Sequence, residues 1–250
     1  MNKTTLVNYI HFDSIHSTNT WTKENASILD PQKISCITAN EQLSGKGRLL
    51  RKWISPKDCN LYATLFFCLP RQFPYTQNLA QLLSISCCKC LNKLNFDVKI
   101  KWPNDLLLDQ KKLGGILCET TQVSNFLGVI LGVGLNINMP EELLGTIDQP
   151  ATSLLQHGGK SWPVSEILAS LLDQFIDDLA LFKTDGFAPF QTQYNTKLLF
   201  LGEHISWKVG DELLTGICEG ASPEGQLCVR LPSGKTTQLF SGEIQKGLIK

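Results

Sequence analysis

The sequence predicts an α+β fold, in which a mixed β-sheet flanked by helices is followed by a small all-β domain. Two observations predict this fold. Residues 1–202 alternate between short apolar runs typical of strands and longer segments with helical spacing. From residue 203 the period changes, and short strand-like runs are separated by turn residues. We therefore expect two domains, residues 1–202 and residues 203–250, the second a small β-barrel.

The composition is that of an ordinary globular protein. Of its 250 residues, 42% are hydrophobic and 18% are charged, which is enough to bury a substantial core. The 23 basic and 23 acidic side chains cancel, so nothing indicates a nucleic-acid partner. No apolar run approaches the roughly 20 residues that span a bilayer, and residues 1–5 lack the apolar region of a signal peptide. We expect a cytoplasmic protein that binds neither nucleic acid nor membrane.

The nine cysteines form an odd number, and most of them lie in apolar runs. This pattern is typical of reduced, buried thiols in a cytosolic protein. Cys87 and Cys90 form a C-x-x-C pair, but the pair falls within a helical pattern and has no matching second pair. Packing of the two thiols as small apolar groups is therefore favoured over metal binding or redox chemistry.

The first element is a short strand at Ile10–Asp13, followed by a segment rich in helix-capping residues at 14–20 and a helix at Trp21–Leu29. Hydroxyl groups and free backbone N–H groups at a helix start can hold a polar or anionic ligand group. Plain helix capping explains the same pattern, so both interpretations stay open here.

A basic loop follows the next strand, Ile34–Asn40. The loop at 41–53 has two glycines interleaved with four cations, Lys46, Arg48, Arg51 and Lys52, and ends on an aromatic residue. It is neither a Walker A loop nor a dinucleotide-binding fingerprint, because it lacks the G-K-[ST] ending of the former and the third glycine of the latter. A basic loop of this kind can still hold phosphates through backbone amides and side-chain charge.

The middle of the chain supplies further sheet and core elements. Asn60–Leu69 is a strongly apolar strand that ends at Pro70, and Tyr75–Leu94 has the apolar spacing of a core helix. Val98–Trp102 is the next strand. It leads directly into the most distinctive stretch of the sequence.

That stretch reads K-W-P-N-D-L-L-L-D-Q-K-K-L-G-G-I-L and predicts a turn followed by a hairpin. Pro103 fixes its own φ, and the following Asn and Asp favour a reversal. Leu106–Leu108 and Lys112–Leu117 are the two predicted strands. Two adjacent glycines weaken a strand, and close approach of a ligand is the usual reason for them. Lys112 beside these glycines suggests an anion held against bare backbone, although a surface turn with a solvated lysine is equally compatible.

Phe126–Asn138 predicts a long strand spaced by glycines. Those at positions 128, 132 and 134 fall on one face, which would let another group pack close. Asn136 near the strand end is positioned either to reach a ligand or to cap the following turn.

A connecting segment with a short helical turn follows at Pro150–Gly159. Two helices are then predicted, one from Trp162 to about Lys183 and one at Phe187–Phe200. Short strands at 204–209, 213–218, 227–231 and 236–240 make up the C-terminal domain.

Taken together, these pieces resemble the biotin–protein ligases over essentially the whole chain. The most specific element is K-W-P-N-D followed by K-L-x-G-I-L, here Lys101–Asp105 and Lys112–Leu117. Supporting segments occur in the family's order: Ser17-Thr18-Asn19, Gln42 with the loop at 45–48, Lys52-Trp53, the segment 134–136 and the C-terminal β domain. The resemblance implies a class II synthetase-like biotin/lipoate ligase catalytic domain with an SH3-like barrel.

The resemblance also implies an activity, that of a biotin–[acetyl-CoA-carboxylase] ligase. Such an enzyme activates biotin as biotinyl-5'-AMP with ATP and Mg²⁺. It then transfers biotin to a lysine of a biotin carboxyl carrier protein or of another biotin-dependent carboxylase. A lipoate–protein ligase of the same fold and a non-catalytic biotin-binding protein are the alternatives. Because the pattern begins within the first 15 residues, we expect a monofunctional ligase without an N-terminal DNA-binding domain, and a homodimer is left open.

The resemblance assigns roles residue by residue. Ser17, Thr18 and Gln42 would bond the ureido ring with Asn19 in support, and the remaining members of the biotin-binding set are Lys46, Gly47, Arg48, Lys112 and Gly115. The nucleotide is assigned to Trp53, Asn104 and Asn136, with the face of Trp53 on adenine. Lys112 and Arg48 are the expected catalytic residues, since their charge would offset that of carboxylate and phosphate. Asp105 is a candidate Mg²⁺ ligand, or else it pins the turn with Asn104.

The basic loop departs from the family's usual G-R-G-R-x-G-R. Lys46 in place of the first arginine keeps the charge but loses the planar fork. Leu50 in place of glycine reduces the freedom of the loop. We expect Leu49 and Leu50 to cover the bound ligand instead.

Overall fold

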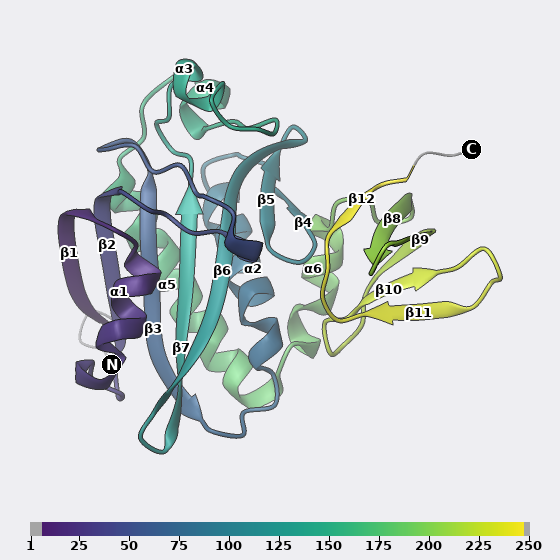
Figure 1. Ribbon diagram of the computed structural model, residues 1–250, viewed down its shortest axis with the longest axis horizontal. Coiled ribbons are helices and arrows are strands. Elements are labelled where there is room, and N and C mark those ends of the chain that lie inside the picture. The colour runs from purple at the N-terminus through teal and green to yellow at the C-terminus, as the bar shows by residue number, and fades with distance from the viewer. Residues whose placement is uncertain (1–6, 248–250) are drawn as a thin grey trace.

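A seven-stranded mixed sheet forms the larger part of the protein, whose computed structural model describes residues 7–247 (Figure 1). The strand order is β1-β2-β3-β7-β6-β5-β4, and β1–β2 is its one parallel pair. The strands are β1 (Val7–Ile15), β2 (Ile34–Gln42), β3 (Leu61–Pro70), β4 (Lys99–Lys101), β5 (Asp105–Leu108), β6 (Lys111–Val123) and β7 (Phe126–Leu135). Because β3, β6 and β7 are the long central strands, they carry the framework on which the site is built.

Helices cover both faces of this sheet, but unequally (Figure 1). Two long helices, α2 (Leu79–Asn92) and α5 (Val164–Asp185), pack behind it and bury the larger apolar core. The short α1 (Thr18–Asn25) with the 3₁₀ turn at 26–28 covers part of the front face, over a smaller apolar cluster. Among residues 7–247, no helix thus covers the front face beside α1 (Figure 1).

Short helical segments connect the main elements. They are the 3₁₀ turns at 48–50, 76–78 and 188–190, and the helices α3 (Glu141–Leu144), α4 (Leu154–Gly158) and α6 (Gln191–Lys197). No helix among residues 7–247 is long and apolar enough to cross a membrane.

The C-terminal domain is a five-stranded antiparallel sheet in the order β11-β10-β9-β8-β12. Its strands are β8 (His204–Val209), β9 (Glu212–Ala221), β10 (Leu227–Arg230), β11 (Thr236–Leu239) and β12 (Ile244–Lys246). The predicted small β domain is therefore confirmed. Within the described residues no pairing joins β11 to β12, so the sheet is open and a closed barrel stays a prediction.

This second sheet is fixed to the first part of the chain by polar contacts. Asn78 Nδ2 donates to Glu224 O (2.9 Å), and Gln81 Nε2 donates to Gly225 O (2.8 Å). Buried apolar residues from both sheets also share the larger apolar cluster. The boundary between 202 and 203 remains a prediction, because packing does not separate the two parts.

The predicted elements are found in their expected order, with some corrections. β6 continues to Val123 instead of ending at Leu117, because its second half pairs fully with β7. The helix predicted from Tyr75 begins instead with a 3₁₀ turn at 76–78, and the regular helix α2 starts only at Leu79. α3 and β12 were not predicted, since four and three residues are too few to show a period.

The nine cysteines are all free thiols, as their odd number and apolar settings predicted. Cys87 and Cys90 are buried in the core, and no group of three or more potential metal ligands occurs among residues 7–247. Burial raises the pKa of Cys36 to about 12 and that of Cys118 to about 12. These thiols are therefore protonated and unreactive at neutral pH.

Candidate active site

A cavity of about 630 Å³ opens on the front face of the large sheet, between α1, the basic loop and the β5–β6 hairpin. Every residue predicted for the site lines this cavity: Ser17, Thr18, Asn19, Gln42, Lys46, Gly47, Arg48, Trp53, Asn104, Asp105, Lys112, Gly115 and Asn136. Segments that lie more than a hundred residues apart in the sequence thus meet at one place. Their individual roles stay predictions, and the geometry below shows what each can do.

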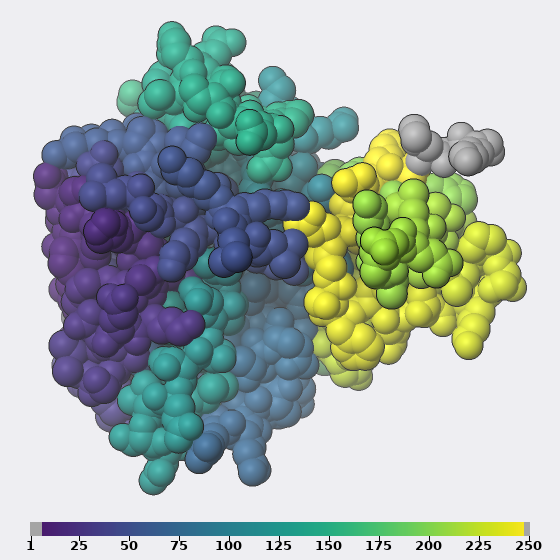
Figure 2. All heavy atoms as spheres, in the orientation of Figure 1, coloured from purple at the N-terminus to yellow at the C-terminus, as the bar shows by residue number. Residues whose placement is uncertain are grey.

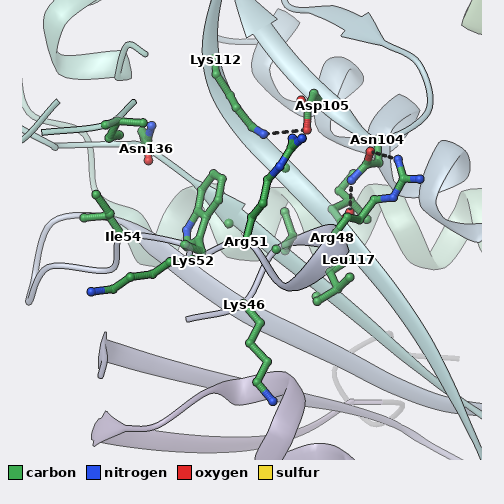
Figure 3. A pocket seen from close by; sticks show the side chains of 18 of the residues that line it. Lys46, Arg48, Arg51, Lys52, Ile54, Asn104, Asp105, Lys112, Leu117 and Asn136 are labelled. Carbon is green, nitrogen blue, oxygen red and sulfur yellow. Dashed lines mark hydrogen bonds and ion pairs between the residues drawn. The ribbon is translucent and has the colours of Figure 1, made fainter. Parts of the chain in front are cut away.

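Lys112 supplies a partly buried positive charge at the mouth of the β5–β6 hairpin (Figure 3). Its ammonium lies 2.8 Å from Asp105 Oδ1, and the two side chains are 16% and 24% exposed. The same ammonium lies 5.7 Å from the centroid of the Trp53 ring, within reach of a cation–π contact. The backbone of Lys112 is bonded on both sides by the segment 150–152, which holds this residue in place. A solvated surface lysine is therefore excluded.

The floor of the cavity is bare backbone. Gly115 on β6 and Gly134 on β7 are direct cross-strand partners, and the indole of Trp53 lies over both. A Cβ atom at Gly134 would lie 2.5 Å from the Trp53 ring, which is too close for any side chain. Two residues earlier on the same face of β7, a Cβ atom at Gly132 would overlap the side chain of Asn19. The predicted glycine face of β7 does let other groups pack close, and those groups are Trp53 and Asn19.

A hydrogen-bond network lies at the polar end of the cavity, at the start of α1. Ser17 Oγ accepts from Thr20 N (3.4 Å) and caps the helix. Gln42 Oε1 accepts from Thr18 N (2.9 Å) and Thr18 Oγ1 (3.2 Å). The buried Thr64 Oγ1 lies 2.8 Å from Thr18 Oγ1 and 2.7 Å from Asn19 Oδ1. The segment 17–19 therefore both caps α1 and forms part of the cavity wall.

The basic loop leans against the C-terminal domain. Arg48 Nη1 donates to Asn104 Oδ1 (3.0 Å) and to Gly242 O (3.4 Å), and Arg51 pairs with Glu243 at 2.7 Å. In Figure 2 the dark blue loop reaches the yellow C-terminal segment. The second domain thus contributes Glu243 to the cavity wall.

Other loop residues lie away from the centre. The Lys46 side chain is exposed and points away from Lys112 (Figure 3). Leu49 and Leu50 have φ values of 54° and 60°, a conformation that bulky residues rarely adopt, and are 70% and 99% exposed. Neither lines the cavity, so the cover expected from them is not formed in this structure.

The two asparagines assigned to the nucleotide are also structural. Asn104 Nδ2 donates to Ile116 O (2.6 Å), and its Oδ1 holds Arg48. Asn136 Nδ2 donates to Thr152 O (3.1 Å), which secures the segment that brackets Lys112. The side chain of Asn136 thus bonds the segment 150–152 rather than the predicted turn at Met139-Pro140, and it also lines the cavity.

The carboxylates around the cavity are already paired in part. Asp105 is bonded to Lys112 rather than pinning the turn with Asn104, and Glu243 is bonded to Arg51. No cluster of three or more acidic or other metal-binding side chains occurs in the described part of the chain. A Mg²⁺ ion here would take most of its oxygen ligands from phosphate groups and water, which is how this ion is commonly bound.

Three residues of the site region were not singled out from the sequence. Thr64 is fully buried in an otherwise apolar strand, and that contrast was the available signal. Ser55 lies two residues after Trp53 and carries no distinctive pattern. Glu243 precedes the unpredicted β12 and reaches the cavity only through tertiary packing.

Comparison with known proteins agrees with this geometry. The model of the biotin/lipoate A/B protein ligase family matches residues 11–136. The chain is 31% identical over 212 residues to the bifunctional ligase/repressor BirA of Escherichia coli, covering 84% of this chain and 65% of that protein. It is 30% identical over 211 residues to the biotin–[acetyl-CoA-carboxylase] ligase of Paracoccus denitrificans, covering 80% and 85% respectively.

Among solved structures, the biotin protein ligase of Aquifex aeolicus in complex with biotin and ATP superposes with a TM-score of 0.79. It is 29% identical, and the match covers 96% of this chain and 99% of that one. The α+β architecture, including the small C-terminal sheet, is thus shared over nearly the whole length of both chains.

Proposed function

Because the chain belongs to the biotin/lipoate A/B protein ligase family, we propose that it is an ATP-dependent biotin–protein ligase. It forms biotinyl-5'-AMP and transfers biotin to a lysine of a biotin carboxyl carrier domain. The observation that carries the proposal is that a polar end, a partly buried cation and an indole line one cavity. The similarity to a ligase solved with biotin and ATP supports it.

Biotin binds with its ureido ring at the polar end. Ser17, Thr18 and Gln42 offer hydroxyl, backbone and amide groups there, and Asn19 supports them through Thr64. The ligand then passes Gly115, whose lack of a side chain leaves room between the side chains of Trp53, Asp105 and Lys112. This path brings its carboxylate toward Lys112.

In the first step, a biotin carboxylate oxygen attacks the α-phosphorus of ATP. The bond between that phosphorus and the bridging oxygen breaks, and pyrophosphate leaves with the electron pair. The protein's task is to bring together negative groups and offset their charge, which Lys112 and Arg48 do. Mg²⁺, which we propose enters with ATP, would add charge compensation at the phosphates, and Asp105, one of the carboxylates that line the cavity, is the protein ligand proposed for it.

The nucleotide lies on the Trp53 side of the cavity. The indole lies against Gly115 and Gly134, and its ring is the aromatic surface on which adenine stacks. Asn136 contacts the nucleotide from the end of β7. Asn104 acts through Arg48, whose guanidinium it orients.

In the second step, the amine nitrogen of the acceptor lysine attacks the acyl carbon of the adenylate. AMP leaves with the electron pair of the broken C–O bond, and the new amide nitrogen loses a proton. The basic loop, with Lys46 and Gly47, closes over the adenylate and keeps out water, which would otherwise hydrolyse it. The acceptor is a subunit of acetyl-CoA carboxylase or of another biotin-dependent carboxylase in the cytoplasm.

A lipoate–protein ligase is the second candidate, because the matching family includes lipoate ligases. A non-catalytic biotin-binding protein is the third, since Lys46 and Leu50, beside Leu49, depart from the family's usual loop pattern. The identities of the similar proteins favour biotin over lipoate. The retained cations Arg48 and Lys112 favour catalysis over mere binding.

Pyrophosphate release distinguishes the three candidates. The purified protein is incubated with ATP, Mg²⁺ and either biotin, lipoate or no acid, and pyrophosphate is measured. We expect release that depends on biotin. Release with lipoate alone would establish the second candidate, and biotin binding without any release would establish the third.

A further inference from the structure

Ser55, which does not line the cavity, joins its two ends. The side chain is 7% exposed. Gln42 Nε2 donates to Ser55 Oγ (3.0 Å), and Ser55 Oγ donates to the backbone carbonyl of Trp53 (3.2 Å). Because Gln42 Oε1 accepts from Thr18, one chain of hydrogen bonds runs from the start of α1 to the tryptophan.

The direction of this chain is fixed by chemistry. The backbone N–H of Thr18 can only donate, so it turns Gln42 Oε1 toward α1 and leaves Nε2 for Ser55. The Trp53 carbonyl can only accept, so the single hydroxyl proton of Ser55 points to it. A movement of the Gln42 amide therefore changes both bonds of Ser55 together.

The backbone around Ser55 and Trp53 is closely packed. Trp53 N donates to Gly45 O (2.8 Å), which brings the two ends of the basic loop together. A Cβ atom at Gly45 would lie 2.5 Å from Trp53 O and 2.7 Å from Ser55 Oγ. A shift of Gln42 is thus transmitted to Trp53 rather than absorbed by empty space.

We propose that Ser55 is a positioning residue that couples ligand binding at the polar end to the placement of Trp53. The inference rests on the proposed function, in which biotin meets Gln42 and adenine meets Trp53. Occupation of one end fixes the chain and so prepares the other. The coupling is reciprocal, because the factor by which biotin tightens nucleotide binding equals the factor by which nucleotide tightens biotin binding.

Calorimetric titration measures this factor directly. The dissociation constant of α,β-methylene-ATP, which cannot release pyrophosphate, is determined without biotin and with saturating biotin. For the unaltered protein we expect a ratio well above one. For Ser55→Ala the ratio falls by about fivefold, the effect of one net hydrogen bond, while the affinity for biotin alone changes less.

Ser35→Ala is the matched control. Ser35 is a fully buried serine on β2, the strand that also carries Gln42, and its hydroxyl has no hydrogen-bond partner in the structure. The ratio of dissociation constants measured for Ser35→Ala should equal that of the unaltered protein. This comparison separates the general effect of losing a buried hydroxyl from the loss of coupling. If Ser55→Ala does not fold, Ser55→Cys keeps the shape with a weaker donor, and the same loss is expected.

An unchanged ratio in the folded Ser55 variant would overturn the inference and leave the proposed function intact. A ratio of one in the unaltered protein would also overturn the inference and leave the proposed function intact. If the unaltered protein binds neither biotin nor the nucleotide analogue, the proposed function fails, and the inference fails with it.

Discussion

The ammonium of Lys112 lies 2.8 Å from the carboxylate of Asp105, so the cation assigned to the substrate's carboxylate is already paired with one of the protein's own. Asp105 and Gly115 are cross-strand partners in the β5–β6 ladder, which places both residues in the cavity wall. The pair keeps a partly buried charge neutral. A substrate carboxylate must therefore share Lys112 with Asp105 or displace it.

Replacing Lys112 tests the charge-offsetting role. In Lys112→Ala we expect adenylate formation to fall by about 10²–10³-fold, as when one preorganised donor to a developing charge is removed. Biotin-dependent pyrophosphate release measures the rate, and circular dichroism checks the fold. Lys111→Ala is the control, because this exposed neighbour does not line the cavity. Near-normal release by Lys112→Ala would refute the assignment.

Removing the charge of Asp105 tests the competition for Lys112. Asp105→Asn keeps the side-chain shape but leaves the ammonium without its anionic partner. We expect biotin to bind severalfold more tightly, because its carboxylate no longer competes with that of Asp105. Calorimetry in the absence of ATP gives the affinity. Weaker binding would mean that Asp105 holds Lys112 in position for the ligand.

A methyl group at Gly134 tests the placement of Trp53. In Gly134→Ala the new Cβ would lie 2.5 Å from the indole, so the ring must leave the glycine floor. We expect the KM for ATP to rise by roughly 5- to 150-fold, corresponding to the ~1–3 kcal/mol of a base stacked on an aromatic side chain. The affinity for biotin should change much less.

Gly132→Ala is the reciprocal variant, two residues away on the same face of β7. Its methyl group would overlap the Asn19 side chain, so the polar end is disturbed instead of Trp53. Here biotin affinity should fall while the KM for ATP is largely retained. If both variants gave the same profile, the division of the cavity into a biotin end and a nucleotide end would be wrong.

Buried thiols make the stability depend on alkaline pH. Burial raises the pKa of Cys36 to about 12 from its ordinary value of 9.0, so the folded state keeps a proton that the unfolded state loses. This contribution is complete below pH 9.0 and declines as pH rises toward 12. Per thiol, the free energy of unfolding should fall by up to about 1.4 kcal/mol per pH unit in that window.

Denaturant unfolding at several pH values from neutral to alkaline measures this decline. Cys36→Ala should show a shallower decline than the unaltered protein, because the variant lacks the thiol whose pKa burial raises. Parallel curves for the two proteins would contradict the contribution assigned to this thiol.

Much of the fold could be predicted, because the sequence patterns of its main strands and helices are local. The apolar run of β3, the glycine spacing of β7 and the K-W-P-N-D hairpin each show their structure within a dozen residues. β12 and α3 are too short to show a period, and tertiary pairing alone defines them. The extension of β6 to Val123 likewise depends on its partner strand, which local sequence does not reveal.

The members of the site could be predicted, but not their connections. Residue types and motif order pointed to Lys112, Trp53 and Gln42, and all three line the cavity. The pairing of Lys112 with Asp105 and the contact of Arg51 with Glu243 arise from packing between distant segments. Ser55 is an ordinary residue type whose importance lies only in the two bonds that it makes.

The central claim is tested most directly by the mass of an acceptor. A biotin carboxyl carrier domain is incubated with the protein, ATP, Mg²⁺ and equal concentrations of biotin and lipoate, and its intact mass is measured. We predict an increase by one biotinyl group, which is lost when the acceptor lysine is replaced by arginine. An increase by a lipoyl group, or an unmodified acceptor, would contradict the assignment.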